Sequence, residues 1–118
     1  MEQERYIQKL DYSVPQELKD QIAYGDQQVS SRTLVQLPLL GITLFAVSQG
    51  QQIRKHTTPG DALVQVLDGL ATITIGESCY RVAAGQSILM PAHVPHALEA
   101  EEAAFKMLLT VVKERRSV

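Results

Sequence analysis

A series of short β-type runs, separated by glycine and proline, begins at Gln27 and limits the fold of this chain more than any other feature. Strands are expected over 29–37, 40–47, 62–67, 71–75, 79–82, 87–90, 96–100 and 105–113. Several short strands at regular spacing, with turn residues between them, indicate a β-sandwich or barrel. Because the chain shows no strand–helix–strand alternation, a parallel α/β sheet is not expected.

Two turn signals stand in the middle of the chain. The segment Thr58-Pro59-Gly60-Asp61 combines a proline that fixes φ with a glycine that permits positive φ. Asp68-Gly69 is a strong hairpin dipeptide, so it predicts a tight turn between the runs 62–67 and 71–75. The sequence therefore predicts an antiparallel, all-β domain.

The first 26 residues are polar and hold the best helix signal. Pro15 stands where proline is favoured, in the first turn of a short helix over 16–22. Leu18 and Ile22 are four residues apart and would share one face of this helix. We expect a single domain, with an N-terminal segment over 1–26 and a β-barrel over 27–118.

Length and charge limit the size and the partners of the protein. A chain of 118 residues is long enough for one domain with its own core. Its formal net charge of -2 gives no sign of the concentrated basic face that a phosphate backbone requires. Nucleic acid is therefore not expected as a partner.

The location of the protein is predicted from three features. No apolar stretch approaches the length of a membrane span, so no membrane partner is expected. The first residues, Met1-Glu2-Gln3-Glu4, lack the basic and apolar parts of a signal peptide. A single cysteine, Cys79, excludes an internal disulfide and fits a reducing compartment. These features predict a cytoplasmic protein.

The last predicted strand, over residues 105–112, is almost wholly apolar, so both of its faces must be covered. One face can line the barrel, and the sequence leaves open whether 105, 107 and 109 or 108, 110 and 112 point inward. The other face needs a second layer, either the N-terminal segment or a second subunit. On this ground we expect a homodimer.

Glycine, proline and histidine recur at fixed spacing from Gly50 onward. Six of these positions form two motifs: Gly50, His56 and Gly69 in the first, and Gly85, Pro91 and His96 in the second. Their spacing resembles that of the cupin superfamily, and the resemblance covers roughly residues 40–112. It implies a double-stranded β-helix, or jelly-roll barrel, of the kind found in small single-domain bacterial members.

This chain departs from the two motifs at positions where other cupins have metal ligands. Cupins that bind a metal use two histidines and a glutamate of the first motif and the histidine of the second. In this chain Thr58 replaces the second histidine and Ala62 replaces the glutamate. The resemblance therefore carries over only His56 and His96 as metal ligands.

A catalytic first-row metal usually has at least three protein ligands. His93, which replaces the glycine of the second motif, is the candidate third ligand, and the carboxylate of Asp61 is another. The ordinary role of such an aspartate is to bond the backbone of its turn. The resemblance implies a divalent transition metal, Zn, Ni, Fe or Mn. In the alternative, His56 and His96 form a polar pair that is satisfied by Thr58 and water.

Strand alternation also predicts the lining of the barrel. If Ala62 points inward, then Val64 and Val66 point inward as well. With Thr58 and Met107 these side chains would form a pocket beside the histidines. Apolar walls with a few polar atoms suit a small organic ligand, but they also describe a filled small barrel.

Three functions remain in competition. The first is a barrel that binds a small organic ligand, a divalent metal or both. The second is a metal-dependent enzyme of the dioxygenase, isomerase or decarboxylase type that uses His56 and His96. The third is a dimeric accessory protein with no small-molecule site. Binding ranks first because Thr58 and Ala62 replace metal ligands.

Overall fold

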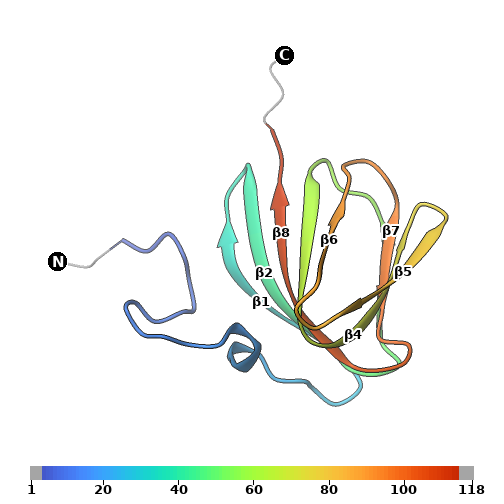
Figure 1. Cartoon of the computed structure of the whole chain (residues 1–118). Helices are drawn as coiled ribbons and strands as arrows, with labels where there is room; N and C mark the ends of the chain where they lie inside the picture. Colours follow the sequence, from blue (N-terminus) through green and yellow to red (C-terminus); the bar gives the residue numbers. More distant parts are fainter. Residues whose placement is uncertain (1–3, 115–118) are drawn as a thin grey trace.

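The computed structural model describes residues 4–114, and these are mostly β-strands (Figure 1). The elements, in chain order, are the 3-10 helix η1 (Leu18–Gln21) and the strands β1 (Val29–Gln36), β2 (Leu40–Val47), β3 (Gln52–His56), β4 (Asp61–Ile75), β5 (Ser78–Ala83), β6 (Ser87–Met90), β7 (His96–Glu99) and β8 (Phe105–Val112). Within residues 4–114, no helix has the length and apolar character needed to cross a membrane.

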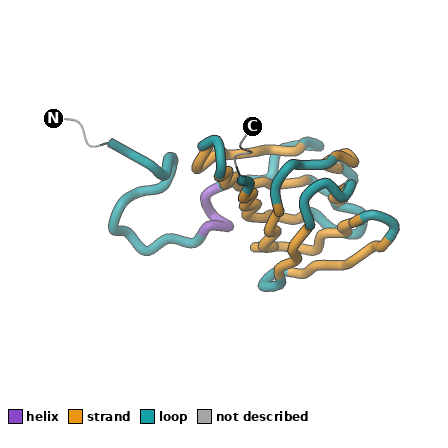
Figure 2. Tube along the Cα trace, turned by 90° about the horizontal axis from the view of Figure 1, so that it is seen from above, coloured by secondary structure: helices purple, strands orange, loops and turns teal. Residues whose placement is uncertain are grey.

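All strand pairs are antiparallel, and they form one curled sheet in the order β1-β2-β8-β4-β7-β3. The long strand β4 also pairs with β6 through its first half and with β5 through its second half. β4 thereby belongs to two layers that face each other (Figure 2). The predicted jelly-roll arrangement is confirmed.

The hairpin predicted at Asp68-Gly69 is wrong, because both residues lie inside the continuous strand β4. The register opposite β8 shifts between Val66 and Asp68, where β4 carries one extra residue. Gly69 adopts φ +77°, and a Cβ there would lie 1.9 Å from the carbonyl oxygen of Ala104. A bulge can require the same positive φ as a tight turn, so this dipeptide bends the strand between the layers.

The core lies between the two layers. Its fully buried members include Val64 and Ile73 from β4 and Phe105 and Met107 from β8, and Leu109 packs against them. This answers the question that the sequence left open, since the inward residues of β8 are those at 105, 107 and 109. The opposite face of β8 points out of the barrel.

A second apolar cluster covers part of that outer face. It is built on Leu34 and Leu44, and Leu108 of β8 packs against it. Leu18 and Ile22 of the N-terminal segment contact the same cluster. The N-terminal segment is therefore the second layer over this part of the sheet.

The helix expected over 16–22 is reduced to the four residues of η1, without a side-chain cap. Side chains of the barrel bind its carbonyl groups: Lys106 Nζ donates to Lys19 O at 2.7 Å, and Arg32 Nη1 donates to Gln21 O at 2.6 Å. The free carbonyls of a helix end need partners of this kind. These bonds fasten the segment to the sheet.

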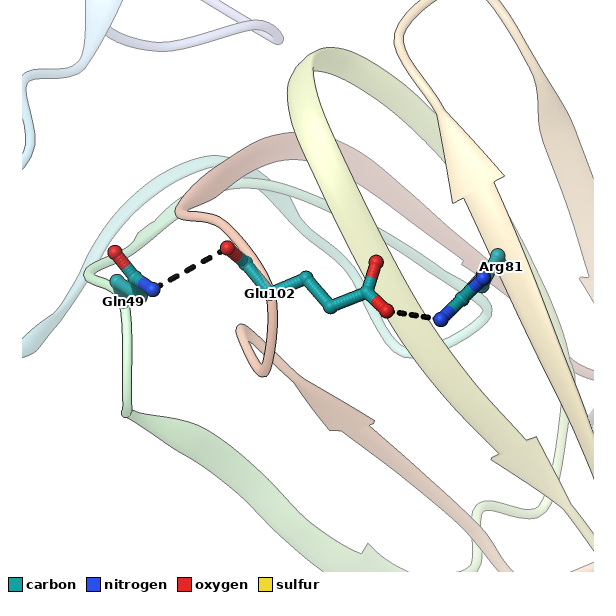
Figure 3. Close-up of polar contacts among 3 residues, drawn as sticks. All are labelled: Gln49, Arg81 and Glu102. Carbon is teal, nitrogen blue, oxygen red and sulfur yellow. Dashed lines mark hydrogen bonds and ion pairs between the residues drawn. The ribbon is translucent and has the colours of Figure 1, made fainter.

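Glu102, between β7 and β8, contacts Gln49 and Arg81 at one end of the barrel (Figure 3). Gln49 Nε2 donates to the Glu102 carbonyl oxygen at 3.2 Å. The Glu102 carboxylate forms an ion pair with Arg81 of β5. The loops at this end are thus joined by side chains, and the histidines lie at the other end.

Candidate functional site

His56 and His96 meet at the end of the barrel where β3 ends and β7 begins. The two residues are direct partners in the antiparallel register of these strands. Their Nε2 atoms are 3.2 Å apart, and their rings meet edge to face with centroids 4.3 Å apart. The convergence predicted from the two motifs is confirmed.

A β-bulge gives His56 its direction. Ile53 pairs with Leu98, and three residues later His56 pairs with His96, although only two steps separate the partners on β7. Residues three apart on a regular strand would point to opposite faces. The extra residue in β3 restores the inward side and turns His56 toward His96.

Backbone bonds between two turns hold the site in place. The N–H of His93, in the loop before β7, donates to Thr58 O at 2.9 Å. The N–H of Ala92 donates to the Asp61 carboxylate at 2.9 Å. The Asp61 carboxylate therefore accepts a backbone hydrogen bond, as its ordinary role predicts. The donor lies in the turn that contains Ala92 and not in the turn that contains Asp61.

The two imidazoles differ in burial. His96 is 3% exposed, whereas His56 is exposed at the rim. Burial lowers the pKa of His96 below its ordinary value, and the charge of a protonated His56 lowers it further, while a hydrogen bond to Val94 O has the opposite effect. His96 is thus a neutral imidazole near pH 7.

The Nδ1 atoms of both rings face carbonyl groups, which can only accept a hydrogen bond. His56 Nδ1 lies 2.7 Å from Arg54 O, and His96 Nδ1 lies 3.3 Å from Val94 O. When both Nδ1 atoms carry the proton, both Nε2 lone pairs are free and face each other. When His96 instead carries its proton on Nε2, it donates to His56 across the 3.2 Å gap. That tautomer gives up the bond from His96 Nδ1 to Val94 O, whereas a cation between the two Nε2 atoms leaves both Nδ1–H bonds in place.

The separation of the Nε2 atoms tests whether a metal ion fits. Two nitrogens that both lie about 2.0–2.1 Å from a tetrahedral ion are about 3.3 Å apart. The 3.2 Å observed between His56 and His96 agrees with this value. The carbonyl acceptors on Nδ1 are also the usual outer partners of metal-bound histidine. The pair therefore fits a divalent ion as two ligands, and the remaining positions are open to water or a small ligand.

His93 does not complete a three-ligand site. Its side chain is exposed, and its backbone adopts φ +67°. Across residues 4–114, no group of three or more histidine, cysteine, aspartate or glutamate side chains is placed to hold a metal ion. His93 adopts a left-handed backbone at the position of the motif's glycine, and its imidazole does not join the pair.

The predicted pocket residues lie in the core. Ala62, Val64 and Met107 are 1%, 0% and 0% exposed and belong to the buried cluster. Thr58 is half-buried, and its hydroxyl donates to Gly60 O at 2.7 Å and not to a histidine. The described site is therefore the rim around the histidine pair, above a packed interior.

Comparisons with known proteins agree with this fold. The family model described as "Cupin domain" matches residues 43–113, which is more than half of the chain. No curated protein is similar enough to count as a match.

Solved structures include one of a conserved protein of unknown function from Streptococcus pyogenes, with 47% identity and a TM-score of 0.90 over 96% of this chain and 98% of that one. A cupin superfamily protein from Desulfitobacterium hafniense has 29% identity and a TM-score of 0.86, over 92% and 98% of the two chains. A cupin 2 conserved barrel domain protein from Leptotrichia buccalis has 40% identity and a TM-score of 0.80, over 81% of this chain and 46% of that one. This chain is therefore a member of the cupin superfamily.

Proposed function

We propose that this cupin barrel binds a divalent transition metal ion at its rim, through Nε2 of His56 and Nε2 of His96. The observation that carries the proposal is the 3.2 Å separation of these two atoms, on rings whose Nδ1 atoms face carbonyl groups. A small organic ligand with oxygen donors would occupy the positions that the protein leaves open. Bound there, the ion would act as a Lewis acid toward that ligand.

Two protein ligands favour reversible binding over a permanent metal centre. A structural zinc site has four protein ligands, and a catalytic one has three. With two imidazoles and no carboxylate, the ion is held weakly and exchanges with solution. We therefore place binding of a small ligand and a metal ahead of catalysis.

An enzyme is the second candidate, and one observation favours it. The lowered pKa keeps His96 neutral near pH 7, as a general base must be. His96 would then accept a proton from a substrate at the rim, with His56 as its hydrogen-bond partner. For either function we retain the cytoplasm as the expected location, with Cys79 as an exposed free thiol.

Calorimetric titration of tag-free protein with Zn²⁺ and with Ni²⁺ tests the proposal. We expect one ion per chain, and we expect His56→Ala and His96→Ala each to weaken binding at least about tenfold, since each removes one of two ligands. His93→Asn is the matched control, because it removes the third histidine of the chain but leaves the pair intact. Binding that is unchanged in both alanine variants would refute the site.

A further inference from the structure

Two consecutive backbone amides join the two turns that flank the histidine pair. The carboxylate of Asp61 accepts the N–H of Ala92 at 2.9 Å. The carbonyl oxygen of Thr58 accepts the next N–H, that of His93, also at 2.9 Å. We call these two bonds the clamp, because they hold the turn after β3 against the turn before β7.

The turn before β7 is a β-turn whose two central amides are both used by the clamp. The N–H of Val94 donates to Pro91 O over a long 3.5 Å, so Ala92 and His93 are the central residues. His93 has φ +67° and Ala92 has no positive φ, which is the pattern of a type II turn. The single bond that closes such a turn leaves both central N–H groups without a partner inside it. The clamp supplies these partners from another segment and thereby fixes where the turn lies.

The last residue of this turn contacts the buried imidazole. The carbonyl oxygen of Val94 lies 3.3 Å from Nδ1 of His96 and can only accept a hydrogen bond. When His96 makes this bond, Nδ1 carries the proton and Nε2 keeps its lone pair. In the other tautomer, Nε2 of His96 donates to Nε2 of His56 across 3.2 Å, and Val94 O loses its partner. The position of Val94 O therefore decides between the two tautomers.

Only the first tautomer leaves His96 ready to bind an ion. A metal-bound imidazole uses an unprotonated nitrogen, and its other N–H donates to an acceptor that fixes the tautomer and the direction of the ring. The 3.3 Å between His96 Nδ1 and Val94 O is longer than the usual range of about 2.7–3.2 Å. A small displacement of the turn would therefore break this bond and favour the tautomer that donates to His56.

We propose that Asp61 is a positioning residue for the histidine pair: through the clamp, its carboxylate holds Val94 O against Nδ1 of His96 and so keeps Nε2 of His96 free for a metal ion. This inference rests on the proposed function, since it concerns the affinity of the same site. Asp61 contributes the only side chain of the clamp, and a carboxylate accepts a stronger hydrogen bond than a carbonyl group does. It acts without being a ligand of the ion.

The clamp can be opened without unfolding the protein. Asp61 is exposed and Ala92 is half-buried. Water can therefore replace the carboxylate at the N–H of Ala92, so a shortened side chain leaves no buried amide unpaired. The pairing of Asp61 with Val112 of β8 is made by the backbone and is kept. Asp61→Ala should therefore fold, with a turn that retains only its bond to Thr58.

Two-bond ¹H–¹⁵N correlation spectra of the metal-free protein at pH 8 report the tautomer of each histidine. We expect wild-type His96 to carry its proton on Nδ1 and Asp61→Ala to shift it toward Nε2. Asp61→Asn has the same charge as Asp61→Ala but keeps an oxygen that accepts the N–H of Ala92, so it should retain the wild-type tautomer. The matched control, Glu102→Ala, removes a carboxylate from the opposite end of the barrel and should change nothing.

The calorimetric titration with Zn²⁺ measures the consequence for affinity. Asp61→Ala should raise the Kd about three- to tenfold, which is less than the roughly 10–100-fold effect of removing an outer partner itself, because Val94 O remains present. Asp61→Asn should retain most of the affinity, and Glu102→Ala should retain all of it.

Three results would overturn the proposal. They are a wild-type His96 that carries its proton on Nε2, a tautomer that is unchanged in Asp61→Ala, and equal effects of Asp61→Ala and Asp61→Asn, which would show that the charge matters and not the bond. If the wild-type protein binds no Zn²⁺, the proposed function fails, and the tautomer comparison alone then decides the role of Asp61.

Discussion

At the scale of single residues, the site depends on the contrast between a buried and an exposed imidazole. His96 is neutral near pH 7 because burial disfavours the charged ring, and His56 is exposed at the rim, where a ligand can reach it. Nδ1 of His56 and of His96 each faces a carbonyl group and sets the direction of its ring. The pair is therefore oriented before any ligand arrives.

This contrast predicts how the stability of the metal-free protein depends on pH. The unfolded chain binds a proton at His96 near pH 6.5, whereas the folded state, with its lowered pKa, does not. The contribution of His96 to the free energy of unfolding should therefore be constant above this pH and should fall as the pH drops through 6.5 toward the folded pKa. Urea denaturation at pH 7.5 and pH 5, with EDTA present, measures the change. His96→Gln should show a smaller loss, and an equal loss in both proteins would contradict the prediction.

His93 provides a separate prediction because its backbone is in the left-handed region, at φ +67°. His93→Gly removes the steric cost of that conformation and should raise the free energy of unfolding by up to about 1 kcal/mol. Thermal unfolding checks the stability, and the metal titration described above should give an unchanged affinity. A loss of metal binding would instead make His93 a ligand.

At the scale of elements, the bend of β4 joins the two layers and depends on one glycine. Gly69→Ala places a Cβ 1.9 Å from Ala104 O at φ +77°. We expect a loss of at least about 3 kcal/mol, because the backbone must move as well as adopt a strained φ. Gly50→Ala is the matched control, since Gly50 has φ +88° with nothing within 4 Å, and it should cost only about 1–2 kcal/mol. Urea denaturation compares the two, and equal losses would show that the close contact is unimportant.

The elements also show what the sequence can and cannot predict. Alternation and turn residues predicted β2 and β6 with their observed bounds. They failed at Asp68-Gly69, because one local conformation serves both a hairpin and a bulge.

The candidate site was also predicted only in part from the sequence. Motif spacing predicted that His56 and His96 converge, yet the bulge in β3 that aims His56 depends on pairing with β7 and leaves no local signal. Strand alternation correctly predicted that Ala62, Val64 and Met107 point into the barrel, but these side chains are packed in the core. Alternation gives the direction of a side chain and not the space beside it.

At the scale of the whole molecule, the two ends of the barrel are different. The end that holds the histidine pair is formed by the turn after β3 and the loop before β7. The opposite end has a hollow of about 260 Å³, lined by residues that include Glu99 and Glu101. Carboxylates attract cations, so the position of a bound ion decides between this acidic end and the histidine pair.

An anomalous difference map from a crystal of the tag-free protein grown with Co²⁺, recorded at the cobalt absorption edge, locates the ion. We expect one peak at bonding distance, about 2.0–2.3 Å, from Nε2 of both His56 and His96. A map with no peak between these two atoms, or with its peak beside Glu99 and Glu101, would contradict it.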